Sequence, residues 1–350
     1  MSNQAAWIKS AGANLTLDSA ETPTPTPNQL LIKTGAIGLN PIEAKLQKFK
    51  VFPIPYPNIL GMSFAGTVEQ VGSSVTDFKA GDRVAVHRSS GGGKDPAKAF
   101  EQTSTGSYQK YVIADAHLTA KLEDNVTFEA GAAAITNLAT AVSALAIFLR
   151  LDRPNPKGPN PANKEKKVLI YGGSSSVGGF AVHFAARAGY TIITTSSPQN
   201  LPTVTSLHPA KIIDHTQPAS SIIEELKAAG PYDAVFDTIG LPSVTTILGQ
   251  VLAEQGGNFY ATQPPFGPLD LPKNVERKFE SFPTAFENPE NEEYRQWFYG
   301  IFGKYLGMGL ANDLIGPEKI EIVDGGLEAI QGALDRLIEG VSGKKLVVKV

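Results

Sequence analysis

The sequence predicts an α/β protein with two domains, one rich in β-strands and one built on a doubly wound parallel sheet. The chain has 350 residues, more than one ordinary compact core holds. Short apolar runs broken by Pro and Gly fill its first third, which is typical of a small β-rich domain. From residue 167 onward strands alternate with helices, and this alternation indicates a parallel sheet covered by helices.

In the first domain we expect strands, an arm and a loop. The segment 21–27 alternates Thr with Pro, so each residue before a proline is pushed out of the helical region and the segment forms an extended arm. Residues 89–106 have little periodicity and predict a mobile surface loop. Residues 152–166 contain four prolines and end in charge, so they form a solvated connection. Strands are predicted at 30–33, 66–71, 83–86 and 109–113.

Residues 131–149 carry no formal charge and approach the length that spans a bilayer. Many of them are Ala, Thr, Ser and Asn, which insert weakly into a membrane. We therefore expect a buried core helix here.

In the second domain the elements follow one another regularly. A helical pattern of Leu327, Ile330, Leu334, Leu337 and Ile338 then precedes a last strand at 345–350. The predicted strands are 167–171, 191–195, 234–237 and 258–261, and the predicted helices are 177–188, 222–229 and 244–252.

Composition excludes several classes of protein. Hydrophobic residues make up 42% of the chain and charged residues 19%, so the chain can bury a core. The net charge of -3 gives no electrostatic reason to expect nucleic acid or a membrane as partner, and we expect a small molecule. The absence of cysteine rules out disulfides, iron–sulfur clusters and thiolate zinc sites. Residues 1–20 lack a basic patch followed by an apolar run, which predicts a cytoplasmic protein.

A glycine-rich turn, GGSSSVGG at 172–179, lies between a predicted strand and a predicted helix. In this arrangement the backbone N–H groups at the helix N-terminus face a pyrophosphate. Gly172 permits the tight turn and Gly178 lets the helix pack closely on the strand. The serines either donate to phosphate or cap the helix, and a tight connection without a ligand is the alternative. The predicted cofactor-binding residues of the turn are Gly172, Ser174, Ser175, Ser176, Val177 and Gly178.

The segment TTSSPQN at 194–200 lies where a dinucleotide fold that prefers NAD places an acid on the ribose 2′-hydroxyl. No Asp or Glu occurs between Thr191 and Ile213, and the hydroxyl and amide donors of Ser196, Ser197 and Asn200 suit a 2′-phosphate. The sequence therefore favours NADP over NAD. The nearest cations are Lys211 and His215, and His215 is either a phosphate contact or a solvated histidine.

Several motifs together resemble the medium-chain dehydrogenase/reductase superfamily. They are PNILGMSFAGTV at 57–68, VGSSVTDFKAGDRV at 71–84, GSYQKYV at 106–112, the glycine turn and SGKKLVVKV at 342–350. The resemblance covers essentially the whole chain. It implies a GroES-like catalytic domain at 1–129, a Rossmann NADP-binding domain at 130–317 and a return to the catalytic domain at 318–350, with a cofactor cleft where the domains join.

Alcohol dehydrogenases of this superfamily bind a catalytic zinc, and the matching positions here are Asn40, Met62 and Ser63. Neither Met nor Ser replaces an imidazole ligand at such a site, so we expect no metal. The zinc-free members that share the Asn40–Pro41 pair are quinone reductases and enoyl reductases. The turn and the TTSSPQN segment most resemble fungal trans-acting enoyl reductases, although Ser175 stands where most quinone reductases have glycine.

The resemblance implies an NADPH-dependent enoyl reductase, of fungal secondary metabolism, that delivers a hydride to the C=C bond of an α,β-unsaturated carbonyl. Asn40, Pro41 and Thr140 would line the nicotinamide, and Asp237 either lies at the site or caps a turn. No proton donor is identified. An NADPH quinone oxidoreductase and a catalytically silent NADPH-binding accessory protein are the alternatives. We expect a monomer or homodimer, acting as a trans partner of a polyketide synthase. The residues that would flank the cofactor from later strands are Ala261, Thr262, Lys345 and Leu346.

Overall fold

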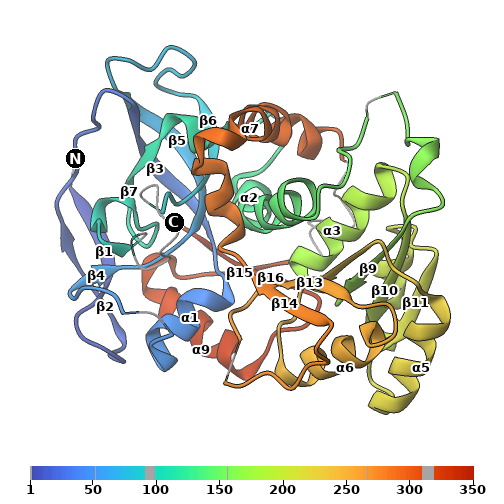
Figure 1. The fold of residues 1–350 in the computed structure, drawn as a ribbon. Coiled ribbons are helices and arrows are strands. Elements are labelled where there is room, and N and C mark those ends of the chain that lie inside the picture. The colour runs from blue at the N-terminus through green and yellow to red at the C-terminus, as the bar shows by residue number, and fades with distance from the viewer. Residues whose placement is uncertain are drawn as a thin grey trace. The chain divides into compact units, whose positions relative to one another are not determined.

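The computed structural model describes residues 2–51, 53–90, 98, 100–155, 157–265, 267–309 and 319–350. The chain divides into two compact units, one of Met1–Thr136 with Pro283–Val350 and one of Asn137–Phe282. Their elements are labelled in Figure 1. The boundaries differ from those that the resemblance implies. The chain passes from the first unit to the second inside helix α2 (Phe128–Val142). It returns to the first unit at Pro283, because helix α7 (Glu292–Gly307) packs on strand β8 (Thr119–Lys121) of that unit.

The first unit contains two sheets. The larger has the order β15-β16-β3-β5-β6-β8, with β7 also pairing with β3, and the smaller has the order β2-β1-β4. Strand β3 is almost wholly buried because it pairs with β5, β7 and β16. Besides β8, the strands of the unit are β1 (Asn3–Ile8), β2 (Leu15–Ala20), β3 (Gln29–Gly38), β4 (Asn58–Ile59), β5 (Ser63–Val71), β6 (Arg83–His87), β7 (Tyr111–Asp115), β15 (Ile320–Val323) and β16 (Lys345–Lys349).

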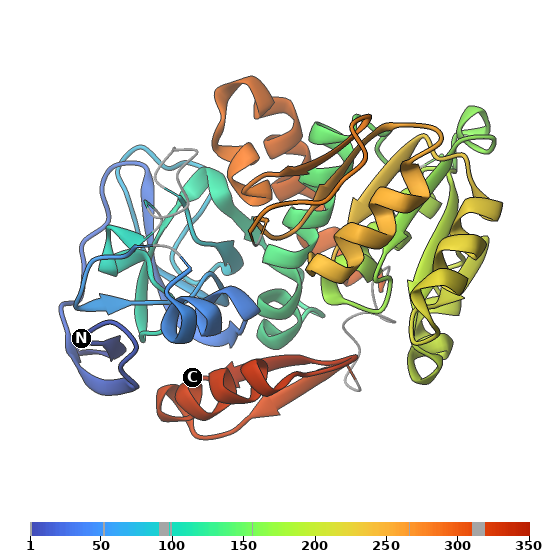
Figure 2. The ribbon, with the colours of Figure 1, turned by 60° about the horizontal axis from the view of Figure 1, so that its bottom comes forward.

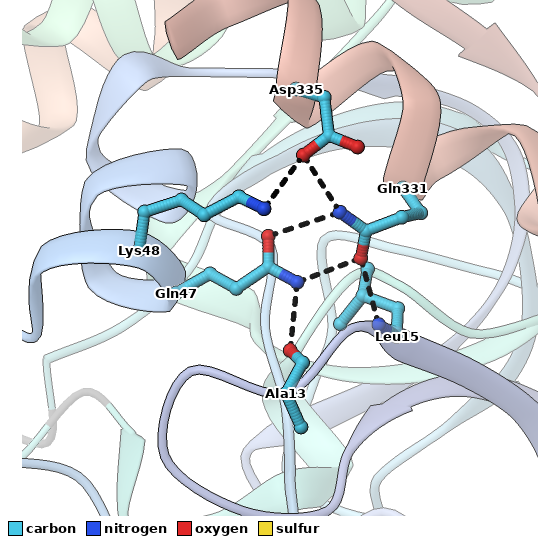
Figure 3. Close-up of polar contacts among 6 residues, drawn as sticks. All are labelled: Ala13, Leu15, Gln47, Lys48, Gln331 and Asp335. Carbon is cyan, nitrogen blue, oxygen red and sulfur yellow. Dashed lines mark hydrogen bonds and ion pairs between the residues drawn. The ribbon is translucent and has the colours of Figure 1, made fainter.

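Helix α1 (Pro41–Phe49) lies beside helix α9 (Ile330–Glu339), and the two can be followed as the blue and red helices of Figure 2. A polar network joins them to the loop between β1 and β2 (Figure 3). The side-chain oxygen of Gln331 accepts hydrogen bonds from the Leu15 N–H and the Gln47 amide, both at 2.7 Å. Gln47 also donates to the Ala13 carbonyl at 2.9 Å. One glutamine thus satisfies donors from two segments about 300 residues away along the chain.

We expect Gln331→Leu to lower the free energy of unfolding by about 1–3 kcal/mol, because it leaves buried or half-buried donors without an acceptor. Urea denaturation measures the change. Lys48→Met is the matched control, since it removes the solvent-exposed ion pair between Lys48 and Asp335 and is expected to cost about 1 kcal/mol or less. Equal losses in the two variants would contradict this interpretation of the network.

The second unit is a parallel six-stranded sheet of order β11-β10-β9-β12-β13-β14. Counted from β9, this is the order 3-2-1-4-5-6 of a doubly wound dinucleotide-binding fold. Helices α5 and α6 pack side by side on one face of the sheet and α3 on the other (Figure 1). The elements are β9 (Lys167–Tyr171), α3 (Ser176–Arg187), β10 (Thr191–Ser196), α4 (Leu201–Thr205), β11 (Lys211–Asp214), α5 (Ala219–Ala229), β12 (Ala234–Asp237), α6 (Pro242–Leu252), β13 (Gly257–Ala261) and β14 (Val275–Phe279).

Helix α2 continues as a π-helical segment, Ser143–Phe148, in which the Leu149 N–H bonds to the Ala144 carbonyl. Together Phe128–Phe148 is long and apolar enough to cross a membrane, but 78% of its most apolar window is buried inside the protein. This burial confirms the predicted core helix.

All the strands and helices predicted from the sequence are present, with ends displaced by a few residues. The sequence patterns missed β1, β2, β4, β8, β14, β15, α1, α4 and α7. The expectation of a mobile surface loop at 89–106 is wrong for the described ends of this segment, because they are held inside the first unit. Ser90 and Phe100 are buried, and the Phe100 carbonyl accepts a hydrogen bond from Asn58 at 2.7 Å. Residues 91–97 and 99 of that prediction lie outside the described residues.

Candidate functional site

The glycine turn joins β9 to α3, as predicted. Gly172 has φ +92°, a conformation that favours glycine. A Cβ atom at Gly178 would overlap the carbonyl oxygen of Gly172, so only glycine lets α3 begin this close to the strand. Both glycines are therefore required by geometry, which is the role that the sequence assigned to them.

Two of the three serines of the turn, Ser175 and Ser176, have different roles. Ser175 is the N-cap of α3, and its hydroxyl oxygen accepts a hydrogen bond from the Gly178 N–H at 2.9 Å. The N–H groups of Ser176 and Val177 precede the first intrahelical bond and point out of the helix end. Together with the positive end of the helix dipole they suit a pyrophosphate. The donor set therefore fits a dinucleotide.

Thr238, which sequence reasoning missed, holds the turn against the neighbouring strand. Its hydroxyl donates to the carbonyls of Tyr171, at 2.8 Å, and Gly172, at 3.1 Å. Because that proton is used, Ser175 is the donor in the 2.8 Å bond between the two hydroxyls. The order of strands reverses between β9 and β12, where such sheets bind ligands. A hydroxyl residue directly after β12 was the signal that could have identified it.

Asp237 ends β12 and caps the turn that follows it. Its Oδ1 accepts hydrogen bonds from the N–H groups of Ile239 and Gly240, both at 2.9 Å. Its Oδ2 is buried and has no partner among the described residues. Burial raises the pKa of Asp237 to about 6, against the lowering effect of those two hydrogen bonds. Of the two roles left open by the sequence, the structure supports capping.

The residues expected at a 2′-phosphate gather where β10 and β11 end. Ser196 is buried, its carbonyl accepts a 3.3 Å hydrogen bond from the His215 N–H, and the Asn200 amide donates to the Ser197 hydroxyl at 3.1 Å. His215 itself is exposed.

Two charged residues change the expectation for this region. Lys211 begins β11, at the far end of the strand from Ser196, and its ammonium faces Glu225 at 3.7 Å. It is therefore not a cation of this cluster. Asp214 pairs with Ser196 in the parallel register and directly follows the acid-free segment 191–213. Its Oδ1 accepts hydrogen bonds from the N–H and hydroxyl of Thr216, which lower the pKa of the carboxyl.

In the first unit, Asn40 and Lys345 come together around a residue that the sequence did not single out, Glu43. Asn40 precedes α1, whose first residue is Pro41. The Asn40 N–H and side-chain amide donate to Glu43 at 2.8 and 3.0 Å, and the Met62 N–H donates to Glu43 at 3.0 Å. The Lys345 ammonium donates to the Asn40 oxygen at 2.6 Å. The acid three residues after Asn40, at the first turn of a helix, was the signal for Glu43.

The electrostatics of this cluster are those of charges removed from water. Burial raises the pKa of Glu43 and lowers the pKa of Lys345 to about 8, each opposed by the attraction between the two. The guanidinium of Arg88 is also buried and donates to the carbonyls of Ile59 and Gln102 at 3.1 and 2.8 Å. Burial lowers the pKa of Arg88 to about 9, and the charge of Glu43 opposes the shift. The charge of Glu43 thus acts on two buried cations, Lys345 and Arg88.

The positions that match zinc ligands in alcohol dehydrogenases are committed to other contacts. The Asn40 oxygen faces an ammonium, and the Ser63 hydroxyl donates to the Ala132 carbonyl at 2.6 Å. Met62 offers a thioether, a poor ligand for zinc. This donor set does not fit a catalytic zinc.

The other predicted residues are distributed between the units. Leu346 lies in the core of the first unit, and its carbonyl accepts from the Leu39 N–H at 3.1 Å. Thr140 is half-buried on α2 in the second unit. Ala261 ends β13, and the Thr262 N–H donates to the Asp237 carbonyl at 2.9 Å, so both lie at the sheet edge that carries the glycine turn.

The fold and the glycine turn define a two-unit protein whose second unit has the fold of a dinucleotide-binding domain. Residues 26–124 match the alcohol dehydrogenase GroES-like domain. A trans-enoyl reductase of Aspergillus flavipes, tndF, is 32% identical over 99% of this chain and 98% of its own. The chain belongs to the medium-chain dehydrogenase/reductase superfamily and is an oxidoreductase of that type.

Two solved structures share the fold over nearly the whole chain. A quinone oxidoreductase of Pseudomonas syringae has a TM-score of 0.75 at 23% identity, covering 100% of both chains. The mycobacterial protein Rv1454c, solved in complex with NADPH, has a TM-score of 0.74 at 22% identity, covering 99% of this chain and 100% of its own. At these identities the likeness concerns the fold.

Proposed function

We propose that this protein is an NADPH-dependent, zinc-free reductase of the C=C bond of an α,β-unsaturated carbonyl. One observation carries the proposal: the zinc-ligand positions of the alcohol dehydrogenases hold Asn40, Met62 and Ser63, and the Asn40 oxygen faces the Lys345 ammonium. Without a Lewis acid on the alcohol oxygen, alcohol oxidation loses its usual driving device. The trans-enoyl reductase relative supports the reaction class. We further propose, as the resemblance to fungal trans-acting enoyl reductases implies, that the protein acts in trans on an intermediate of a polyketide synthase.

The chain's own residues would bind and orient the cofactor. The N–H groups of Ser176 and Val177 would hold the pyrophosphate, and Ser197 with Asn200 would hold the 2′-phosphate. NADPH, when bound, supplies the hydride. The protein contributes orientation and a polar environment for the charge that develops on the substrate oxygen.

The test is spectrophotometric. The protein is mixed with NADPH and, separately, with enoyl thioesters, enones and quinones, and absorbance at the nicotinamide band is followed. Oxidation with enoyl thioesters or enones supports the proposal. Oxidation with quinones alone would identify a quinone reductase, and tight NADPH binding without oxidation by any acceptor would identify a silent accessory protein.

Ser197→Asp is expected to weaken NADPH binding about tenfold or more and to change NADH binding less than twofold. The reason is that a carboxylate would meet the 2′-phosphate, which NADH lacks. Dissociation constants from nicotinamide fluorescence measure both. Ser220→Asp, at an exposed position of α5, adds the same charge to the same unit and should leave both constants unchanged. Equal weakening of the two cofactors by Ser197→Asp would place the 2′-phosphate elsewhere.

A further inference from the structure

One carboxylate, that of Asp214, lies at the corner of the second unit where β10 and β11 end. Asp214 and Ser196 are partners in the parallel register of these two strands. Because side chains alternate between the faces of a sheet, partners in register project to the same face. The chain stays at this corner after β11, since the His215 N–H donates to the Ser196 carbonyl at 3.3 Å.

The residues proposed to hold a 2′-phosphate belong to the same corner. Ser197 directly follows β10, and the Asn200 amide donates to the Ser197 hydroxyl at 3.1 Å. The turn that contains them leads into α4, and α4 packs on β11, the strand that ends with Asp214. All of these residues lie in the second unit, so their arrangement does not depend on the first unit.

The Asp214 carboxylate is charged, and no lysine or arginine among the described residues forms an ion pair with it. Its Oδ1 accepts hydrogen bonds from the N–H and the hydroxyl of Thr216, at 2.8 and 2.7 Å. These two hydrogen bonds, helped by the nearby His215, lower the pKa of the carboxyl. Lys211 is on the same strand but faces Glu225 at 3.7 Å. The corner therefore carries a fixed negative charge beside its hydroxyl and amide donors.

A negative charge at this corner acts differently on the two nicotinamide cofactors. A phosphate monoester carries close to two negative charges above neutral pH, and NADPH has one on the ribose where NADH has a hydroxyl. The carboxylate therefore opposes NADPH and has little effect on NADH. The donors of Ser197 and Asn200 favour NADPH at the same place, so the selectivity is the difference between an attractive and a repulsive contribution.

We propose that Asp214 is a specificity-determining residue, whose carboxylate repels the 2′-phosphate and so narrows the preference for NADPH over NADH that Ser197 and Asn200 provide. The inference rests on the proposed function, which assigns the 2′-phosphate to this corner. It adds a residue that acts against the phosphate, where the proposed function names only residues that hold it.

Asp214→Asn removes the charge and keeps the turn, because an asparagine oxygen accepts from the Thr216 N–H and hydroxyl as an aspartate oxygen does. We expect the dissociation constant of NADPH to fall about five- to tenfold at pH 8 and low salt, the size of effect that removing one nearby like charge produces. The dissociation constant of NADH should stay within about twofold of the wild type, because NADH lacks the phosphate. Titrations of nicotinamide fluorescence measure both constants.

Glu254→Gln is the matched control, because it also removes one negative charge from the second unit. Glu254 is exposed and pairs with Lys227 in the last turn of α5, the helix that leads away from the corner. Both dissociation constants should equal those of the wild type.

Ionic strength provides a readout that a change of shape alone would not move. Raising the salt from about 0.05 M to about 0.5 M screens charges in partly exposed sites. The gain in NADPH affinity from Asp214→Asn should shrink accordingly. In the wild type, NADPH should gain affinity relative to NADH as the salt rises, and this reading needs no variant to fold. A relative loss instead would mean that a cation dominates the corner, which would overturn the inference.

The outcomes separate the inference from the function on which it rests. If Ser197→Asp weakens NADPH selectively and Asp214→Asn changes neither constant, the 2′-phosphate lies at the corner and the inference fails alone. If Asp214→Asn tightens both cofactors equally, its charge acts on the pyrophosphate that they share, and the specificity role is overturned. If Ser197→Asp weakens both cofactors equally, the 2′-phosphate site of the proposed function fails and the inference falls with it. Absence of NADPH oxidation with every acceptor overturns only the reaction, since the binding constants are measured without turnover.

Discussion

Gly178→Ala is expected to lower the free energy of unfolding by about 1–3 kcal/mol and to weaken NADPH binding more than tenfold. The added Cβ atom would overlap the Gly172 carbonyl oxygen and come within 2.8 Å of the Thr238 hydroxyl. The helix start must then move away from the strand, and the N–H groups that face the pyrophosphate move with it. Urea denaturation and a fluorescence titration with NADPH measure the two effects.

Gly332→Ala is the matched control, because this glycine also lies inside a helix, α9, but has open space around it. Here the change should raise stability by about 0.5–1 kcal/mol, since alanine loses less conformational freedom on folding. Cofactor binding should not change. A stable Gly178→Ala variant with normal NADPH affinity would contradict the role given to the turn.

Glu43→Leu is expected to lower the free energy of unfolding by about 3–5 kcal/mol, the cost of leaving one partner of a buried charge pair alone. The change removes the acceptor of three N–H donors, two from Asn40 and one from Met62. It also removes the negative charge that stabilises the Lys345 ammonium. Thermal and urea denaturation measure the loss.

Glu43→Gln separates charge from hydrogen bonding, because it keeps an acceptor oxygen and removes the charge. Its loss should be smaller than that of Glu43→Leu. It should also lower the pKa of Lys345 further, since the attraction of Glu43 now opposes that shift. A Glu43→Leu variant as stable as the wild type would contradict the stabilising role given to the Glu43 carboxylate.

Much of the fold could be predicted because the patterns were strong. The β/α alternation and the glycine turn identified the second unit, since periodicity and turn chemistry are local properties of the chain. The strands β2 and β15 were missed because no residue of either is fully buried, so neither carries a strong apolar pattern. The boundary at Pro283 differs from the one that the resemblance implies, because the packing of α7 on β8 is a tertiary contact that local patterns do not show.

The site could be predicted only in part. Asn40 and the turn residues were identified by motif. Glu43 and Thr238 had weaker local signals, and the partners that give them their roles come close only in the folded chain. Lys345, from the other end of the chain, meets Asn40 and its partner Glu43 only in the folded protein. Leu346 was expected at the cofactor, yet its side chain lies in the hydrophobic core because successive residues of β16 face opposite sides of the sheet.

The first unit is built from both ends of the chain, and this has a consequence during synthesis. Strand β16, which supplies Lys345, pairs with β3 through contacts such as Val347 with Gly38. It is synthesised after the whole second unit, so the sheet of the first unit stays incomplete until β16 has left the ribosome. The second unit is continuous from Asn137 to Phe282 and completes earlier. A nascent chain therefore carries a folded nucleotide-binding unit beside an open β-sheet, which is the stage most exposed to aggregation.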